Sequence, residues 1–345
     1  MKTFDLKGAV LSLNTPTIVS LLNSIEYYKG KTADLAKLKK IDTLKKMAYR
    51  SNAIASNAIG NIYVQEDRER VLCEHLSQPR TLQEHMVVGY TNALDLIEEV
   101  YKFQTMDRAF LTTLHYYIYK DYNPEFGGRY KDSQNYIQEA QPDGSFKTIF
   151  VTAKPQNVVP FLDNIIYQFN ECAKDEECNK LLLTAAFMFD FMCIHPYNHG
   201  NGRVSRLTLH FLLKKFGYDV DDYFAIPYLM KHKLGDYIDA FKLSAETWRN
   251  EETNYAPFVE FVLRRILDAY HKLDYIIEVN QMDATCEEKV LKVVNDSATP
   301  ISKTMVLRVL YPISKATVEK ALSKLLKEGR IQLITKGRYS KYFRI

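Results

Sequence analysis

The 345-residue chain has few residues that interrupt or cross-link a fold: 13 glycines, 11 prolines and five cysteines. The cysteines are odd in number and lack metal-ligand spacing, which argues against a disulfide framework or a zinc site. They are Cys73, Cys172, Cys178, Cys193 and Cys286. No apolar run approaches the roughly 18 residues of a membrane span, and the N-terminus lacks the apolar core of a signal peptide. We therefore expect a reduced, cytoplasmic protein without membrane contact.

Charge is unevenly distributed along the chain, whose formal net charge is +4. Residues 301–345 contain eleven Lys and Arg but two Glu, so this segment carries +9 and the remaining 300 residues sum to −5. A split of this size favours separate functions for the two parts. We expect an N-terminal helical region over 1–80, a core over 81–280 and a third domain over 283–345.

Apolar residues recur with a 3.6-residue period over most of the chain, which predicts a mainly α fold. The predicted helices before residue 280 cover 17–28, 33–51, 83–101, 110–120, 157–173, 179–194, 204–216, 233–248 and 256–279. Residues 181–194 are apolar nearly all round. This pattern predicts a buried helix that leads to His195.

One segment between the helices has a β pattern. Residues 129–151 alternate in polarity around Pro142-Asp143-Gly144, a turn signal, and so predict a hairpin. The hairpin is either a plain surface feature or an edge to which the backbone of a protein substrate adds.

Residues 195–206, HPYNHGNGRVSR, carry the clearest chemical signal. His195 stands five residues before a Gly-Asn-Gly turn, and Arg203 and Arg206 follow. Glycines let the backbone approach an anion, and a helix that starts at the turn offers free N–H groups. Two arginines three apart share a helix face and can hold further phosphates. Such a set suits attack by a deprotonated hydroxyl on a phosphoryl group.

This segment resembles the signature of the Fic family, usually written HPFx(D/E)GNGRxxR. The matching positions are His195, Pro196, Gly200, Asn201, Gly202, Arg203 and Arg206. Tyr197 replaces the Phe, and His199 replaces the family's metal-binding acid. The resemblance covers about residues 13–267. It implies a Fic-type helical bundle with a β-hairpin flap at 129–151, and transfer of AMP from ATP to a Ser, Thr or Tyr hydroxyl of a protein.

The resemblance also implies roles for individual residues. His195 would be the general base, and Asn201 would help to hold the developing charge. Gly200, Gly202, Arg203 and Arg206 would bind the nucleotide. ATP, a divalent metal ion (Mg²⁺ or Mn²⁺), a protein substrate, self-modification and a homodimer are the expected cofactors and partners. Tyr237 lies where the family often has an aromatic residue near adenine, although core packing is favoured for it.

An upstream segment resembles the family's inhibitory helix, (S/T)xxxE(G/N). Ser56 and Asn61 fill the first and last positions, but Gly60 stands where the glutamate should be. In the family this glutamate pairs with the second motif arginine, here Arg206, and glycine has no carboxylate with which to do so. We expect an inhibitory segment that keeps its shape and has lost its chemistry. Gly60 is either natural, with other regulation, or a replacement of the glutamate; the intact remainder of the motif favours replacement.

His199 leaves several interpretations open. Imidazole is a poor ligand for Mg²⁺, which prefers carboxylate and water oxygens, and suits softer ions better. In order of preference, the metal ion is held by nucleotide phosphates and water, a softer ion is used, or another phosphate-containing donor replaces ATP. A loop histidine in an inactive site is the remaining alternative.

The basic C-terminal segment has its own pattern. Three short helices and a hairpin are predicted over 287–295, 303–311, 315–328 and 331–345, with the hairpin turn at Lys336-Gly337. These are the elements of a winged helix-turn-helix, and Ser314 would cap its third helix. Basic residues there indicate DNA binding by 283–345, or a dimerisation or substrate-docking module. The competing function is thus a nucleotide-sensing DNA-binding regulator with a weak or inactive Fic core.

Overall fold

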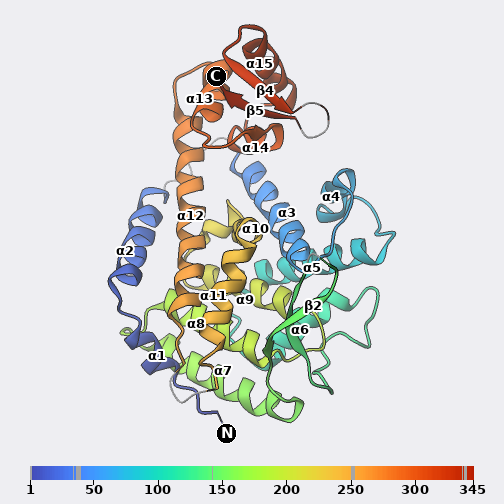
Figure 1. Cartoon of the computed structure of the whole chain (residues 1–345), viewed down its shortest axis with the longest axis vertical. Coiled ribbons are helices and arrows are strands. Elements are labelled where there is room, and N and C mark those ends of the chain that lie inside the picture. The colour runs from blue at the N-terminus through green and yellow to red at the C-terminus, as the bar shows by residue number, and fades with distance from the viewer. Residues whose placement is uncertain are drawn as a thin grey trace.

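The computed structural model describes residues 2–33, 35, 40–141, 143–249, 253–335, 337 and 340–345. A helical body occupies most of this chain, and the long helix α12 (Ala256–Gln281) runs from it to a small C-terminal part (Figure 1). The other helices of the body are α1 (Leu6–Ser12), α2 (Pro16–Lys31), α3 (Ile41–Ile59), α4 (Glu66–Cys73), α5 (Leu82–Val100), α6 (Arg108–Tyr119), α7 (Val158–Lys174), α8 (Lys180–Ile194), α9 (Asn201–Lys215), α10 (Ile226–His232) and α11 (Leu234–Ala245). The short 3-10 helices η2 (Pro155–Asn157) and η3 (Asp219–Asp222) complete it.

The observed bounds differ most from the prediction at the third helix of the chain. The prediction over 33–51 included residues 34 and 36–39, which lie outside the described residues, and the helix observed there, α3, continues to Ile59. Its last turn includes Ser56, the first position of the segment that resembles an inhibitory helix. Asn52, Ser56 and Asn57 are buried there, and each side chain forms a hydrogen bond, while Oδ1 of Asn57 has no partner among the described residues.

Helix α8 confirms the prediction of a buried helix that leads to His195. Asn179 caps its start by accepting hydrogen bonds from the N–H groups of Leu181 and Leu182. All residues from Leu181 to Ile194 are buried. His195 ends the helix in the left-handed region, at φ 51°, so the chain turns sharply there.

The predicted hairpin is present as β1 (Tyr136–Ala140) and β2 (Phe146–Val151), which pair antiparallel with an irregularity at Ile137/Gln138. At its turn the Asp143 carboxylate accepts the N–H of Ser145, and Gly144 adopts φ 83°. Pro142, part of the predicted turn, lies outside the described residues.

The C-terminal part contains α13 (Cys286–Asn295), β3 (Ile301–Ser302), α14 (Lys303–Val309), α15 (Lys315–Lys327), β4 (Ile331–Thr335) and β5 (Lys341–Arg344). The strands form a small antiparallel sheet in the order β3-β5-β4. The Ser314 hydroxyl accepts the Thr317 N–H and caps α15 as predicted. Lys336, expected in the hairpin turn, lies outside the described residues. The assignment of this part as a winged helix-turn-helix stays a prediction.

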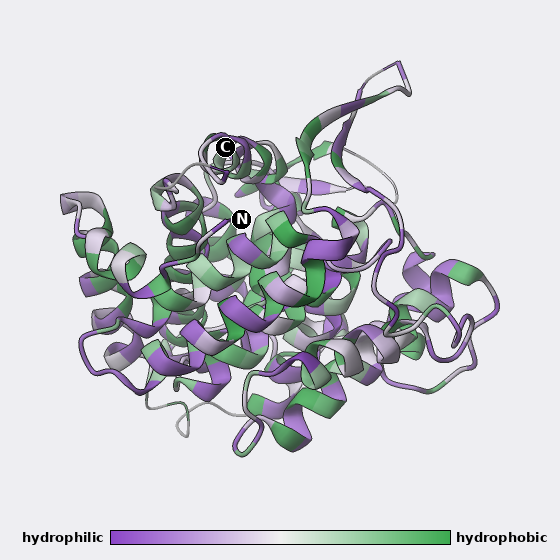
Figure 2. Ribbon diagram, turned by 90° about the horizontal axis from the view of Figure 1, so that it is seen from below, coloured by the Kyte–Doolittle hydropathy of each residue, from purple (hydrophilic) through white to green (hydrophobic). Residues whose placement is uncertain are grey.

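Hydrophilic and hydrophobic residues alternate along the outer helices (Figure 2), as expected where one face of a helix packs on the core. Within the described ranges, no single helix is long and apolar enough to cross a membrane. Helices α1 and α2 pass that test only as a pair, and the pair is bent by 91°.

Candidate active site

His195 presents a neutral imidazole where α8 ends. Its Nδ1 lies 3.1 Å from the Met192 carbonyl oxygen. A carbonyl only accepts, so Nδ1 carries the proton and Nε2 keeps a free lone pair. Burial lowers the pKa of His195 to about 3, against the opposing effect of the Met192 hydrogen bond, and the charges of Lys131 and His199 lower it further. The imidazole is therefore neutral at neutral pH, with Nε2 unprotonated.

Asn201 closes the loop that follows His195. Its side-chain oxygen accepts the Tyr197 N–H at 2.9 Å, and its side-chain nitrogen donates to the Tyr197 carbonyl at 2.6 Å. The residue is 1% exposed. Each end of the amide thus forms one hydrogen bond with the backbone of Tyr197, and the expected role of Asn201 in holding developing charge stays a prediction. In this structure it shapes the loop.

Helix α6 supplies two loop supports that the sequence reasoning missed. His115 donates through Nε2 to the His199 carbonyl at 3.0 Å and accepts the Gly128 N–H at Nδ1. Burial lowers the pKa of His115 to about 4, which keeps Nδ1 an acceptor. One turn later, the Tyr119 hydroxyl accepts a 2.7 Å hydrogen bond from Arg203. Their spacing of four on an amphipathic helix was the only sequence signal for this pair.

The backbone angle and the neighbouring Tyr119 ring require glycine at position 200, directly before α9. Gly200 has φ 84°, and a Cβ there would lie 3.0 Å from the Tyr119 ring. No side chain caps the start of α9, so its first N–H groups remain available to an anion, as predicted from the turn.

The two motif arginines are both buried but differ in their partners. Arg203 donates a hydrogen bond from Nη2 to the Tyr119 hydroxyl, while its Nη1 is buried and forms no hydrogen bond of good geometry with the described residues. Arg206 donates from Nε and Nη2 to the hydroxyl and carbonyl oxygens of Ser56. The two predicted regulatory positions that follow lie at the end of α3: Gly60 is the C-cap residue, and Asn61 has φ 59°.

A cleft of about 1050 Å³ joins these elements. Its walls come from the end of α3, α5, α6, the β1–β2 hairpin, the motif loop and α11. The predicted residues that line it are His199, Gly200, Gly202, Arg203, Arg206, Gly60 and Asn61. Tyr237, for which core packing was favoured, is 7% exposed and also lines the cleft.

The lining residues do not suit a protein-bound Mg²⁺ ion. The exposed ring of His199 stacks on Phe126, with ring centroids 5.9 Å apart. Glu139 is the one carboxylate among the described lining residues, and it forms a 2.8 Å ion pair with Lys242. A hard cation therefore finds no free carboxylate in this cleft.

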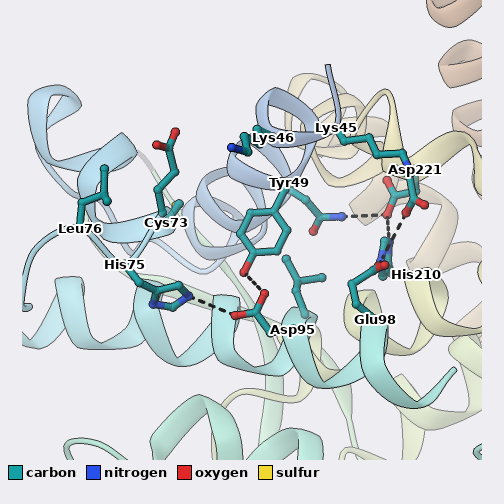
Figure 3. Close-up of a pocket in the computed structure, with 14 residues that line it drawn as sticks. Lys45, Lys46, Tyr49, Cys73, His75, Leu76, Asp95, Glu98, His210 and Asp221 are labelled. Carbon is teal, nitrogen blue, oxygen red and sulfur yellow. Dashed lines mark hydrogen bonds and ion pairs between the residues drawn. The ribbon is translucent and has the colours of Figure 1, made fainter. Parts of the chain in front are cut away.

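A second pocket, of about 480 Å³, contains a group with metal-ligand spacing, Glu98, His210 and Asp222 (Figure 3). Burial alone would lower the pKa of His210, but its hydrogen bonds to Asp221 and Glu98 outweigh this effect and raise that pKa to about 10. A protonated imidazole has no lone pair for a metal ion. The Lys214 ammonium already bridges Glu98 and Asp222 at 2.9 and 2.5 Å, so the group is an ion-pair network.

Comparisons with known proteins agree with this architecture. A Fic family protein from Desulfovibrio desulfuricans aligns with a TM-score of 0.62 at 16% identity, over 96% of this chain and 96% of its own. A Fic domain containing signaling protein from Bacteroides thetaiotaomicron gives 0.59 at 19% identity, over 73% of this chain and 95% of its own. Fic-1 from C. elegans aligns with a TM-score of 0.59 at 15% identity, over 76% of this chain and 73% of its own. The chain therefore has the mainly helical Fic fold, with the β1–β2 hairpin and a small C-terminal sheet.

The sequence comparisons concern one segment of the chain and one distant relative. Residues 105–213 match the Fic/DOC family, so the segment that contains the motif is of Fic/DOC type. The protein adenylyltransferase Fic of Nematostella vectensis is 23% identical over 236 residues, which are 65% of this chain and 49% of that relative. The chain is thus its distant relative and spans about half of its length.

Proposed function

We propose that the chain is a protein adenylyltransferase, which transfers AMP from ATP to a Ser, Thr or Tyr hydroxyl of a protein, its own chain included. The observation that carries this proposal is the neutral His195 at the end of α8, with Nε2 unprotonated, followed after a five-residue loop by the open N-terminus of α9. The distant relative in Nematostella vectensis bears the name of this activity, which also supports the proposal.

The proposed reaction needs no residue beyond the loop and α9. Nε2 of His195 takes the proton of the target hydroxyl, and the hydroxyl oxygen attacks the α-phosphorus of ATP. The bond from that phosphorus to the bridging oxygen breaks, and pyrophosphate leaves with its electron pair. N–H groups at the start of α9 hold the developing charge, while Arg203 and Arg206 hold the β- and γ-phosphates. Asn201 acts by fixing the loop.

We propose further that the end of α3 is an inhibitory segment without its carboxylate. Ser56 contacts Arg206, and Gly60 and Asn61 lie at the rim of the cleft. These positions are consistent with a glutamate side chain at 60 that would reach toward Arg206 in an inhibited form. With glycine there, the restraint on ATP binding is expected to be weak.

Mass spectrometry of the protein after incubation with ATP and candidate substrate proteins tests the proposal. We expect a mass increase of one AMP on the chain or on a partner, and none for His195→Ala. Undiminished AMP addition in His195→Ala would contradict the proposal. So would the absence of AMP addition in the unaltered chain with every metal ion tested.

A second candidate function, a nucleotide-sensing DNA-binding regulator, is favoured by one observation. Helix α15 exposes Lys315, Lys320 and Lys327, which form none of the ion pairs found in the described part of the chain. Exposed lysines without such ion pairs suit contact with a phosphate backbone. Duplex binding that weakens with salt, without any AMP transfer, would favour this function over the enzyme.

A further inference from the structure

Among the described residues that line the candidate cleft, three buried polar atoms form no hydrogen bond of good geometry. They are Nη1 of Arg203 and the hydroxyl oxygens of Tyr122 and Tyr237. All three residues line the 1050 Å³ cleft. Buried polar groups are nearly always paired in native proteins, so three unpaired groups around one cleft indicate a ligand that is rich in acceptors.

The chemistry of the three groups is that of donors. A guanidinium can only donate. Burial raises the pKa of both Tyr122 and Tyr237, so both hydroxyls keep their protons at neutral pH. The Tyr122 ring lies 5.5 Å from that of Tyr119, the residue that holds Arg203. The hydroxyl of Tyr237 lies beside the Arg206 guanidinium, and that of Tyr122 beside Arg203; a guanidinium can only donate to these oxygens, so both hydroxyl protons remain free for a ligand. Each tyrosine therefore stands beside one motif arginine.

The same cleft is poor in groups that hold a metal ion. His199 occupies the position of the expected acid, and Glu139 is neutralised by Lys242. The negative charge of a phosphate chain bound here would meet two guanidiniums, two hydroxyl donors and the N–H groups at the start of α9. Oxygen-rich anions bind well to such a set without a metal ion held by the protein.

We propose that Tyr122 and Tyr237 are phosphate-binding residues, which with Arg203 hold the polyphosphate of the nucleotide directly and replace a carboxylate-held metal ion. The ligand class is a nucleoside triphosphate or another polyphosphate. The identification of the ligand as the nucleotide donor rests on the proposed adenylyltransferase function; the polyphosphate site does not.

Calorimetric titration with inorganic tripolyphosphate tests the site without any transfer reaction. We expect binding in EDTA, with a Kd within about threefold of that in Mg²⁺, and a Kd raised about tenfold in both Tyr122→Phe and Tyr237→Phe. Tyr167→Phe, which alters an exposed ring away from the cleft, is the matched control and should bind as the unaltered chain does. Because each cleft variant removes an unpaired buried hydroxyl, the ligand-free proteins should unfold at the same or a higher temperature.

This pairing of weaker binding with unreduced stability separates ligand contact from a structural role. Loss of tripolyphosphate binding in EDTA, or unaltered binding by both Phe variants, would overturn the proposal. Intact tripolyphosphate binding without AMP transfer to any protein would instead contradict the proposed function and leave the polyphosphate site supported.

Discussion

The guanidinium of Arg206 donates to two atoms of Ser56, the hydroxyl oxygen at 2.8 Å and the backbone carbonyl oxygen at 2.7 Å. Both acceptors that Ser56 of α3 offers to Arg206 of α9 are thus uncharged oxygens. Gly60, which follows, has φ −92°, and a Cβ there would find its nearest neighbour, the Asn57 carbonyl oxygen, at 3.4 Å. A Cβ therefore fits at position 60 without a clash or backbone strain.

Gly60→Glu should restore inhibition of AMP transfer. A carboxylate at the rim of the cleft would compete with the nucleotide phosphates for Arg206, and a charge-assisted hydrogen bond of about 1.5–3 kcal/mol corresponds to roughly a 10- to 100-fold loss of kcat/KM. Gly60→Gln has the same size without the charge and should retain most activity. Equal activities of the two variants, measured with labelled ATP, would show that position 60 does not act through charge.

His199→Asp should make AMP transfer respond to Mg²⁺. The aspartate adds the hard oxygen ligand that the cleft lacks, so we expect Mg²⁺ to stimulate this variant about tenfold more than it stimulates the unaltered chain. His199→Asn serves as the uncharged control. The measurement is initial rate against Mg²⁺, Mn²⁺ and Zn²⁺ concentration. An Mg²⁺ response identical in all three proteins would refute this account of His199.

Much of the site was predictable because its function depends on local sequence. The dodecapeptide specifies a helix end, a glycine turn and a helix start, so the positions of His195, Gly200 and Arg203 follow from backbone rules that act over a few residues. The buried α8 was equally clear, since a helix apolar on every side has to lie inside the fold.

The remainder depends on contacts between distant residues. His115 forms a hydrogen bond with the His199 carbonyl, 84 residues away in the sequence, and Ser56 forms one with Arg206, 150 residues away. Nothing near His115 in the sequence marks its partner. Asn201 was assigned a role from the motif, whereas its actual hydrogen bonds depend on how the loop folds back onto Tyr197. Local patterns thus predicted candidate reacting groups, whose roles stay predictions, and missed the groups that hold the loop in place.

His115 should act as a positioning residue for the loop. His115→Phe keeps an aromatic ring stacked on Tyr197 but removes both hydrogen bonds, and we expect kcat to fall about 10- to 100-fold because the anion-binding backbone shifts. His115→Gln can still donate to the His199 carbonyl and should recover part of the loss. Steady-state kinetics with ATP check this, together with circular dichroism to confirm folding. Equal kcat values for the Phe and Gln variants would contradict a role through that hydrogen bond.

The His210 network should make stability depend on alkaline pH. The pKa of His210 is raised from 6.5 to about 10, so its contribution is complete below pH 6.5 and is lost as the pH rises through 10. The free energy of unfolding should therefore fall across this window. His210→Gln leaves Asp221 without its cationic partner, so it should lower stability by about 3 kcal/mol at pH 7 and flatten that slope. Urea unfolding at pH 7 and 9.5 measures both effects, and parallel pH profiles would disprove the assignment.

The exposed lysines of α15 allow a test of the DNA-binding alternative. If Lys315, Lys320 and Lys327 contact phosphates, replacing all three with Glu should abolish duplex binding, and for the unaltered chain log K should fall with log salt at a slope of roughly −2 to −3. The matched control is a triple Glu variant of Lys102, Lys154 and Lys272, exposed lysines of the helical body with the same change in net charge. Fluorescence anisotropy with a labelled duplex measures all three proteins.

An equal loss of duplex binding in both triple variants would show that binding depends only on net charge. The absence of binding by the unaltered chain at low salt would exclude DNA as a partner. AMP transfer should be unaffected by the α15 variant, since these lysines lie outside the cleft.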